Sequence, residues 1–95
     1  MIITILKRRW RVLRPRQITC DGEPQHGDCD SPDRPNKAIR IIKSLRDRVE
    51  LETFLHEMLH ASDWSKDESW VEEVAHDISQ SLWRLGYRRI EDTNE

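Results

Sequence analysis

The sequence predicts a single α+β domain, in which a small N-terminal antiparallel sheet precedes two helices. Its 95 residues suffice for one domain with one modest core. Up to residue 44, hydrophobic side chains have the alternation and composition of strands. From residue 45 onward they recur with the period of a helix. This change of period divides the domain, residues 1–95, into strands with a loop at 1–44 and a helical half.

Two segments have the character of strands. From Ile2 to Arg14, β-branched and aromatic residues alternate with polar and basic ones around Trp10, which predicts one long strand or a bent pair. Residues 37–43 form a second, shorter run of this kind. Between the two, residues 19–36 hold most of the prolines and glycines, and we expect a long loop there. The two strand segments are expected to pair across this loop.

Two helices are predicted at residues 45–62 and 66–86, and residues 87–95 are expected to form a polar tail. In both helices the hydrophobic residues fall mainly on one face. In the first these residues are Val49, Leu51, Phe54, Leu55, Met58 and Leu59, and in the second they are Val71, Val74, Ala75, Ile78, Leu82 and Leu85. We expect these stripes to build the core together with Trp10, Trp64, Trp70 and Trp83.

Local signals mark the ends of the predicted helices. Asp47 followed by Glu50, and Ser65 followed by Glu68, have the spacing of a capping box. Gly86 is suited to end the second helix, because glycine readily adopts the left-handed conformation of a helix C-terminus.

Charge and cysteine content narrow the class of protein. The net charge is −2, but six basic residues precede the first acidic one. We interpret this basic segment as a solvated strand edge, with a nucleic-acid surface as the weaker alternative. Cys20 and Cys29 are too few for a disulfide-rich secreted domain, and no apolar run approaches the roughly 20 residues of a membrane span. We therefore expect a cytoplasmic protein without a membrane partner.

Residues 56–60, His-Glu-Met-Leu-His, form an HExxH motif inside the first predicted helix. Side chains at positions i and i+4 stand one turn apart on the same face, so His56 and His60 can bind one metal ion together. Glu57 lies beside them and can take a proton from a zinc-bound water without being a ligand. The motif predicts a zinc site with Glu57 as the general base.

Catalytic zinc usually has a third protein ligand. The longer motif HExxHxxGxxH is absent, because Asp63 and Lys66 occupy its glycine and its third histidine position. A second helix that returns after a short connection would bring Glu72 or Glu73 near the ion. On this argument either carboxylate can be the third ligand.

With these residues the sequence resembles the gluzincins, whose thermolysin-like members carry HExxH on one helix and a glutamate ligand on the next, with an aspartate four residues later. Glu73 and Asp77 have this spacing. The resemblance implies that Glu73 is the third zinc ligand and that Asp77 orients His56. The ImmA/IrrE-like and SprT-like small proteases are a similar comparison, and the ExxA spacing of the former favours Glu72.

Two other polar groups receive simpler interpretations. Cys20, His26, Asp28, Cys29 and Asp30 do not have the spacing of a zinc knuckle, so we expect a loop with free thiols. His76 is expected to be a surface histidine that pairs with neighbouring acids.

The predicted function is peptide-bond hydrolysis by a minimal zincin metallopeptidase, with Zn²⁺ as cofactor and a peptide or protein as substrate. The resemblance, rather than the spacing, selects a peptide as the substrate. The alternative is a non-catalytic binding or regulatory module in which zinc stabilises a small fold. In that case the basic N-terminal strand would be the contact for nucleic acid. Replacement of Glu57 separates the two functions, because only the enzyme needs a general base.

Overall fold

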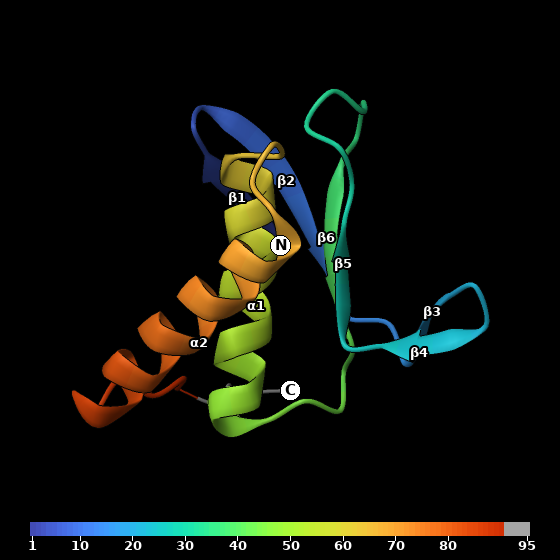
Figure 1. Ribbon diagram of the computed structural model, residues 1–95. Helices are drawn as coiled ribbons and strands as arrows, with labels where there is room; N and C mark the ends of the chain where they lie inside the picture. Colours follow the sequence, from blue (N-terminus) through green and yellow to red (C-terminus); the bar gives the residue numbers. More distant parts are fainter. Residues whose placement is uncertain (91–95) are drawn as a thin grey trace.

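The computed structural model describes residues 1–90, and its elements follow one another as six strands and two helices (Figure 1). They are β1 (Ile2–Ile5), β2 (Arg8–Leu13), β3 (Ile18–Cys20), β4 (Glu23–Gln25), β5 (Gly27–Cys29), β6 (Ala38–Ile41), α1 (Asp47–Ser62) and α2 (Glu68–Arg84). The predicted α+β class is confirmed. The last five residues of the expected tail, 91–95, lie outside the described residues.

The main sheet has four strands in the order β1-β2-β6-β5. The Ile2 to Arg14 segment is a bent pair, because β1 and β2 form an antiparallel hairpin whose turn residues Leu6 and Lys7 have positive φ. β5 is antiparallel to β6, whereas β2 is parallel to β6. The sheet is therefore mixed rather than wholly antiparallel, since the chain between β2 and β6 returns to the end of the sheet at which β2 begins.

The long loop expected at residues 19–36 is wrong in part, because this segment contains strands. β3 and β4 form a separate two-stranded hairpin whose turn is Asp21-Gly22, with φ of 53° and 81°. An Asp-Gly turn is a strong hairpin signal. Strands of three residues are too short to show an alternating pattern, so the composition of the segment predicted a loop instead. β5 follows directly and becomes the edge of the main sheet.

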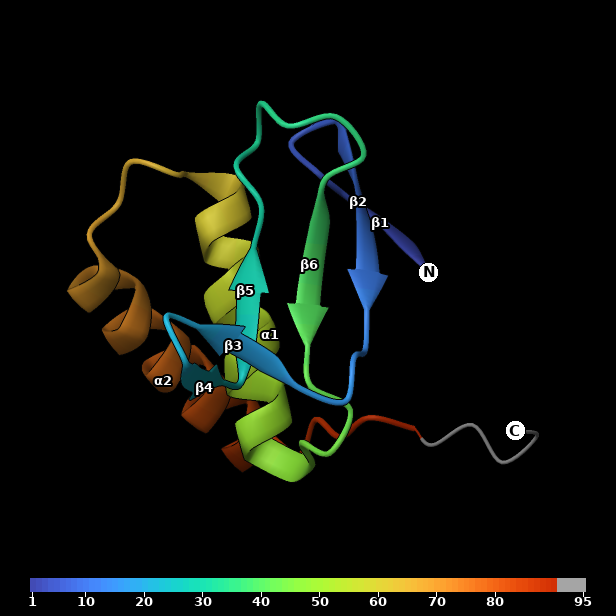
Figure 2. The same ribbon diagram turned by 90° about the vertical axis from the view of Figure 1, so that its right-hand side faces the viewer.

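α1 lies against one face of the main sheet, and α2 packs chiefly against α1 (Figures 1 and 2). The core cluster contains Trp10, Ile39, Ile41 and Ala61, with Phe54 and Met58 among the side chains packed on it. The expectation for the tryptophans holds for Trp10, which is fully buried. It is wrong for Trp64 and Trp70, which are 50% and 41% exposed, because the turn between the helices and the start of α2 lie at the surface.

The face of α1 that is most deeply buried is not the predicted apolar stripe. Its buried residues are Glu50, Thr53, Glu57 and Ala61, whereas Val49 from the stripe is exposed. α1 lies between the sheet and α2, so it has contacts on two sides and its polar line meets the sheet. On α2 the buried residues are Val71, Ala75 and Ser79.

Both predicted capping boxes are wrong. The residue before α1 is Arg46 and the residue before α2 is Asp67, and neither makes a side-chain cap. The Ser65 hydroxyl instead donates a hydrogen bond of 2.6 Å to the Asp63 carboxylate, within the turn between the helices. α2 consequently begins at Glu68, two residues later than predicted. Neither helix of the described chain is long and apolar enough to cross a membrane.

Candidate metal centre

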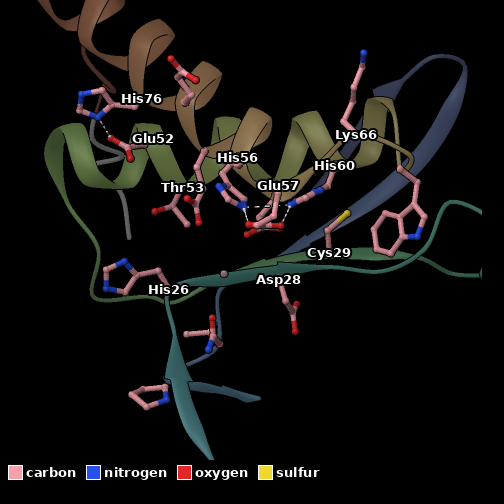
Figure 3. A pocket seen from close by; sticks show the side chains of 18 residues that line it. His26, Asp28, Cys29, Glu52, Thr53, His56, Glu57, His60, Lys66 and His76 are labelled. Atoms are coloured by element: carbon pink, nitrogen blue, oxygen red, sulfur yellow. Dashed lines mark hydrogen bonds and ion pairs between the residues drawn. The ribbon is translucent and has the colours of Figure 1, made fainter. Parts of the chain in front are cut away.

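The HExxH motif occupies the last turns of α1, and its histidines converge as the spacing predicts. The two Nε2 atoms of His56 and His60 are 3.2 Å apart. Both imidazoles are partly buried, with 21% and 16% of their side chains exposed, and both face the cleft drawn in Figure 3. The pair is therefore open to solvent on one side and held by the helix backbone on the other.

Glu57 lies between the histidines and the sheet. Its residue surface is only 6% exposed, and no hydrogen bond or ion pair joins its carboxylate to any other residue of the described 1–90. Burial raises the pKa of Glu57 to about 8, and the nearby charges of Asp28 and Glu68 add to this effect. A buried carboxyl group without a partner is costly, so its presence calls for a functional explanation.

Gly27 of β5 makes room for the Glu57 carboxylate. A Cβ atom at Gly27 would lie 3.1 Å from Oε2 of Glu57, 3.0 Å from Cγ2 of Thr53 and 2.9 Å from the backbone oxygen of Arg40. The strand can therefore approach α1 this closely only because residue 27 has no side chain.

Glu68 is the carboxylate in contact with the histidine pair. Its Oε1 is 2.7 Å from Nε2 of His56 and its Oε2 is 2.9 Å from Nε2 of His60. Glu68 is the first residue of α2, and 61% of its side chain is exposed. A single carboxylate of α2 thus reaches both imidazoles of α1.

The donor set suits zinc. Two imidazole nitrogens and one carboxylate are the ligands of many catalytic zinc sites, which leave a further position for water. Ligands at the usual zinc distance in a tetrahedral arrangement are about 3.3 Å apart, close to the separation of 3.2 Å between the two Nε2 atoms. The donor atoms of His56, Glu57 and His60 also lie within 4.8 Å of one another. These groups can hold one ion while Glu57 stays beside it.

The acidic residues predicted from the sequence as third ligands lie elsewhere on α2. Glu72 and Glu73 are exposed and line the same cleft, but no ion pair joins either one to His56 or His60 within residues 1–90. Asp77 likewise makes no hydrogen bond or ion pair with His56 in this part of the chain.

Glu68 was missed because the sequence does not give the angle between the helices. Its carboxylate was interpreted as half of a capping box. α2 begins beside the end of α1 and then diverges from it (Figure 1). Its first residue, Glu68, therefore contacts both histidines. The short connection of residues 63–67 was the signal that could have pointed to the first turn of α2.

A cleft of about 1180 Å³ contains the candidate metal centre. α1 and α2 form one side of it, and β5 with the end of β4 forms the other.

In antiparallel pairs, alternate residues direct their backbone groups to opposite edges. The backbone N–H of Ile42 donates a hydrogen bond of 2.9 Å to the oxygen of His26, and the N–H of Asp30 donates one of 3.0 Å to the oxygen of Ala38. His26 and Asp30 thus direct these backbone groups toward β6. The backbone groups of Gly27 and Cys29 therefore point to the free edge of the sheet, along the cleft.

Two further polar residues of the cleft, His76 and Asp28, have partners. His76 pairs with Glu52 of α1 at 3.3 Å, so the expected pairing with an acid is present, but the acid belongs to the other helix. Asp28 pairs with Arg40. Cys20 and Cys29 are both free thiols, as expected. Burial, with smaller effects of Glu57 and Asp30, raises the pKa of Cys29 to about 12, so this thiol is protonated at neutral pH.

Comparison of the chain with models of protein families, with curated proteins and with solved structures finds no match. The side chains of the cleft and the HExxH motif are the features that indicate a function.

Proposed function

We propose that this protein is a minimal zinc metallopeptidase of the zincin type, in which His56 and His60 bind Zn²⁺ and Glu57 is the general base. The observation that carries the proposal is the Glu57 carboxylate, which is buried, unpaired within residues 1–90 and placed beside two converging imidazoles. A structural zinc site needs four closed ligands and no such base.

For the third ligand we propose Glu68 in preference to Glu73. Support comes from its contacts of 2.7 and 2.9 Å with the two Nε2 atoms, which place its oxygens where an ion bound to both histidines would need them. Glu73 and Glu72 are the alternative third ligands, and the same experiment tests them. Both line the cleft, but neither makes an ion pair with an imidazole among residues 1–90.

The chemistry assigned to each group is that of amide hydrolysis. Zinc, when bound, would polarise the scissile carbonyl and lower the pKa of a water molecule. Glu57 accepts a proton from this water as its oxygen attacks the carbonyl carbon, and passes the proton to the leaving nitrogen when the C–N bond breaks. The free edge at Gly27 and Cys29 would pair with an extended substrate by backbone hydrogen bonds. This edge favours a polypeptide over other hydrolysable substrates. Because both cysteines are free thiols, the compartment that we propose is the cytoplasm.

The alternative, a zinc-stabilised module without activity, finds less support. Its ligands would have to be closed to water, whereas the candidate site opens into a cleft and 61% of the Glu68 side chain is exposed. A nucleic-acid contact through the N-terminal strand has the basic side chains it needs, but Arg11 already donates to the backbone oxygen of Asn36 at 2.8 Å.

The test is zinc analysis and a peptide-cleavage assay on the full-length protein, with single variants at Glu57, Glu68, Glu72 and Glu73. We expect one equivalent of zinc in the parent protein and in Glu57→Gln, with cleavage only in the parent. Glu68→Ala should lower zinc affinity by at least tenfold, while Glu72→Ala and Glu73→Ala keep it. Full activity in Glu57→Gln would contradict the proposal. Loss of zinc in Glu73→Ala, but not in Glu68→Ala, would show that Glu73 is the third ligand.

A further inference from the structure

The walls of the cleft are strongly acidic. Six carboxylates line it and Lys66 is its one lysine or arginine: the acids are Asp28, Glu52, Glu57, Glu68, Glu72 and Glu73. Two of the six are already paired with arginines outside the cleft, Asp28 with Arg40 and Glu52 with Arg48. Of the other four, Glu68 contacts His56 and His60. Glu57, Glu72 and Glu73 have no ion-pair partner among residues 1–90.

The one basic residue of the lining does not neutralise these acids. The Nζ atom of Lys66 lies 4.9 Å from the centroid of the Trp70 ring, on which it makes a cation–π contact. Lys66 belongs to the turn between the helices, at the end of the cleft next to His60 and opposite to His76 (Figure 3). Lys66 makes no ion pair with a carboxylate of the cleft among residues 1–90.

Two independent features indicate that a ligand occupies this cleft. The Glu57 side chain is more than nine-tenths buried, has no partner within residues 1–90 and faces the cleft. The edge strand also presents the unpaired backbone groups of Gly27 and Cys29 along the same space, which suits an extended polypeptide. A bound divalent ion would offset about two charges, those of the neighbouring Glu57 and Glu68.

The charges that remain are those of Glu72 and Glu73. Glu72 lies four residues beyond Glu68, about 6 Å along the axis of α2. That distance corresponds to roughly two residues of an extended chain. β5 runs from the Thr53 side of the cleft, where Gly27 lies, toward His60 (Figure 3). A substrate antiparallel to β5 would therefore place the residues after the scissile bond near Glu72 and Glu73.

From this placement we infer that the cleft selects polypeptide segments with a lysine or arginine about two residues after the scissile bond. The inference rests on the proposed peptidase function and adds the class of substrate to it. Glu72 and Glu73 are the specificity-determining residues, since their charges have no other partner among residues 1–90. An acidic segment would be repelled at the same position.

The experiment uses the full-length, zinc-loaded protein and a library of chymotryptic peptides, with cleavage sites identified by mass spectrometry. We expect lysine and arginine to be enriched within three residues after the cleaved bond. For one lysine peptide and its glutamine analogue, the Glu72→Gln/Glu73→Gln variant should lose roughly five- to tenfold in kcat/KM on the lysine peptide alone, at about threefold per carboxylate. The double variant Glu23→Gln/Asp33→Asn removes the same charge outside the cleft lining and should leave both values unchanged.

The outcomes separate this inference from the proposed function. Zinc-dependent cleavage without basic enrichment, or with equal losses on both peptides, would overturn the substrate class but not the peptidase function.

Absence of cleavage of any peptide would overturn the peptidase function. In that case the anisotropy of fluorescein-labelled lysine and glutamate decapeptides decides the charge preference of the cleft. Binding of the lysine peptide that weakens with salt and with Glu72→Gln/Glu73→Gln supports it, and equal binding of both peptides refutes it. Zinc content is measured in each variant so that metal loss is not mistaken for a specificity effect.

Discussion

Glu50 and Glu57 are two glutamates with the same burial and opposite surroundings. They lie seven positions apart on one face of α1, and each is 6% exposed. Glu50 accepts hydrogen bonds from Arg14 at 2.9 Å and from Arg89 at 2.8 Å. Glu57 has no partner within residues 1–90 and has a pKa raised to about 8. The first carboxylate joins three segments of the chain, whereas the second is kept free, which is the expected condition of a catalytic base.

The largest expected effect is a loss of catalysis when Glu57, the unpaired glutamate, is replaced. Glu57→Gln should lower kcat/KM for a cleaved peptide by at least 10²-fold, because a general base contributes about 10² to 10⁴. Zinc binding should be unchanged, because the proposal makes Glu57 the general base and not a ligand. Rates are measured with the zinc-loaded protein. As the control, Glu23→Gln alters an exposed carboxylate outside the cleft and should keep the parental rate, and a similar loss in that variant would show a nonspecific effect.

For the free energy of unfolding we expect the reverse: replacing Glu50 destabilises the protein, and replacing Glu57 does not. Glu50→Ala is expected to lower the free energy of unfolding by about 2–3 kcal/mol, because it removes a buried acceptor from two arginines. This is at the lower end for a buried pair, since 61% of the Arg89 side chain is exposed. Glu57→Gln should not destabilise the metal-free protein at pH 7. Urea unfolding of both variants in a chelating buffer measures the difference, and equal losses would remove the contrast.

The pH dependence of the metal-free protein should show the cost of burying Glu57. The folded-state pKa of about 8 exceeds the ordinary value of 4.5, so the folded protein binds more protons than the unfolded chain between these values. Stability is therefore lost as the pH rises from 4.5 to 8, with a contribution of up to about 1.4 kcal/mol per pH unit. Subtracting the curve of Glu57→Gln from that of the parent isolates this contribution. A difference that does not change with pH would refute the raised pKa.

The smallest predicted effect tests the space around Glu57. Gly27→Ala should cost about 1 kcal/mol in stability, because the new Cβ would lie 2.9 Å from a backbone oxygen and the strand must move. It should also lower kcat by about tenfold, since the same Cβ displaces the Glu57 carboxylate. Cleavage rates and thermal unfolding are measured together. Gly22→Ala is the control for the cleavage rate alone, since its Cβ has no neighbour within 4 Å, whereas its φ of 81° would itself strain an alanine. A Gly27→Ala protein with parental kcat would show that Glu57 does not depend on this space.

The parts of the molecule that depend on local geometry could be predicted from the sequence. His56 and His60 converge because the α-helix itself sets the spacing of i and i+4, and no tertiary contact is needed. The existence of both helices also follows from the period of the hydrophobic residues. For residues 2–14 this period predicts strand structure but leaves one long strand and a bent pair as alternatives, and the structure has the pair. The burial of Trp10 is consistent with its central place in that pattern.

The parts that depend on how elements cross could not be predicted. Glu68 approaches the histidines only because α2 starts beside the end of α1, and the angle between the helices leaves no mark in the local sequence. The strand β5 has three residues, so no alternation reveals it, although it supplies the edge of the sheet and Gly27. Glu57 illustrates the same limit, because a carboxylate in the buried line of a helix contradicts the rule by which buried positions are recognised.

X-ray absorption at the zinc K-edge of the zinc-loaded protein tests the central claim most directly. The account predicts two imidazoles and one or two oxygens from carboxylate and water at about 2.0–2.2 Å. It also predicts loss of the imidazole signal in a His56→Ala/His60→Ala protein and loss of the carboxylate in Glu68→Ala. A protein that binds no zinc, or a zinc ion with a sulfur ligand at about 2.3 Å from Cys29 and no pair of imidazoles, would contradict it.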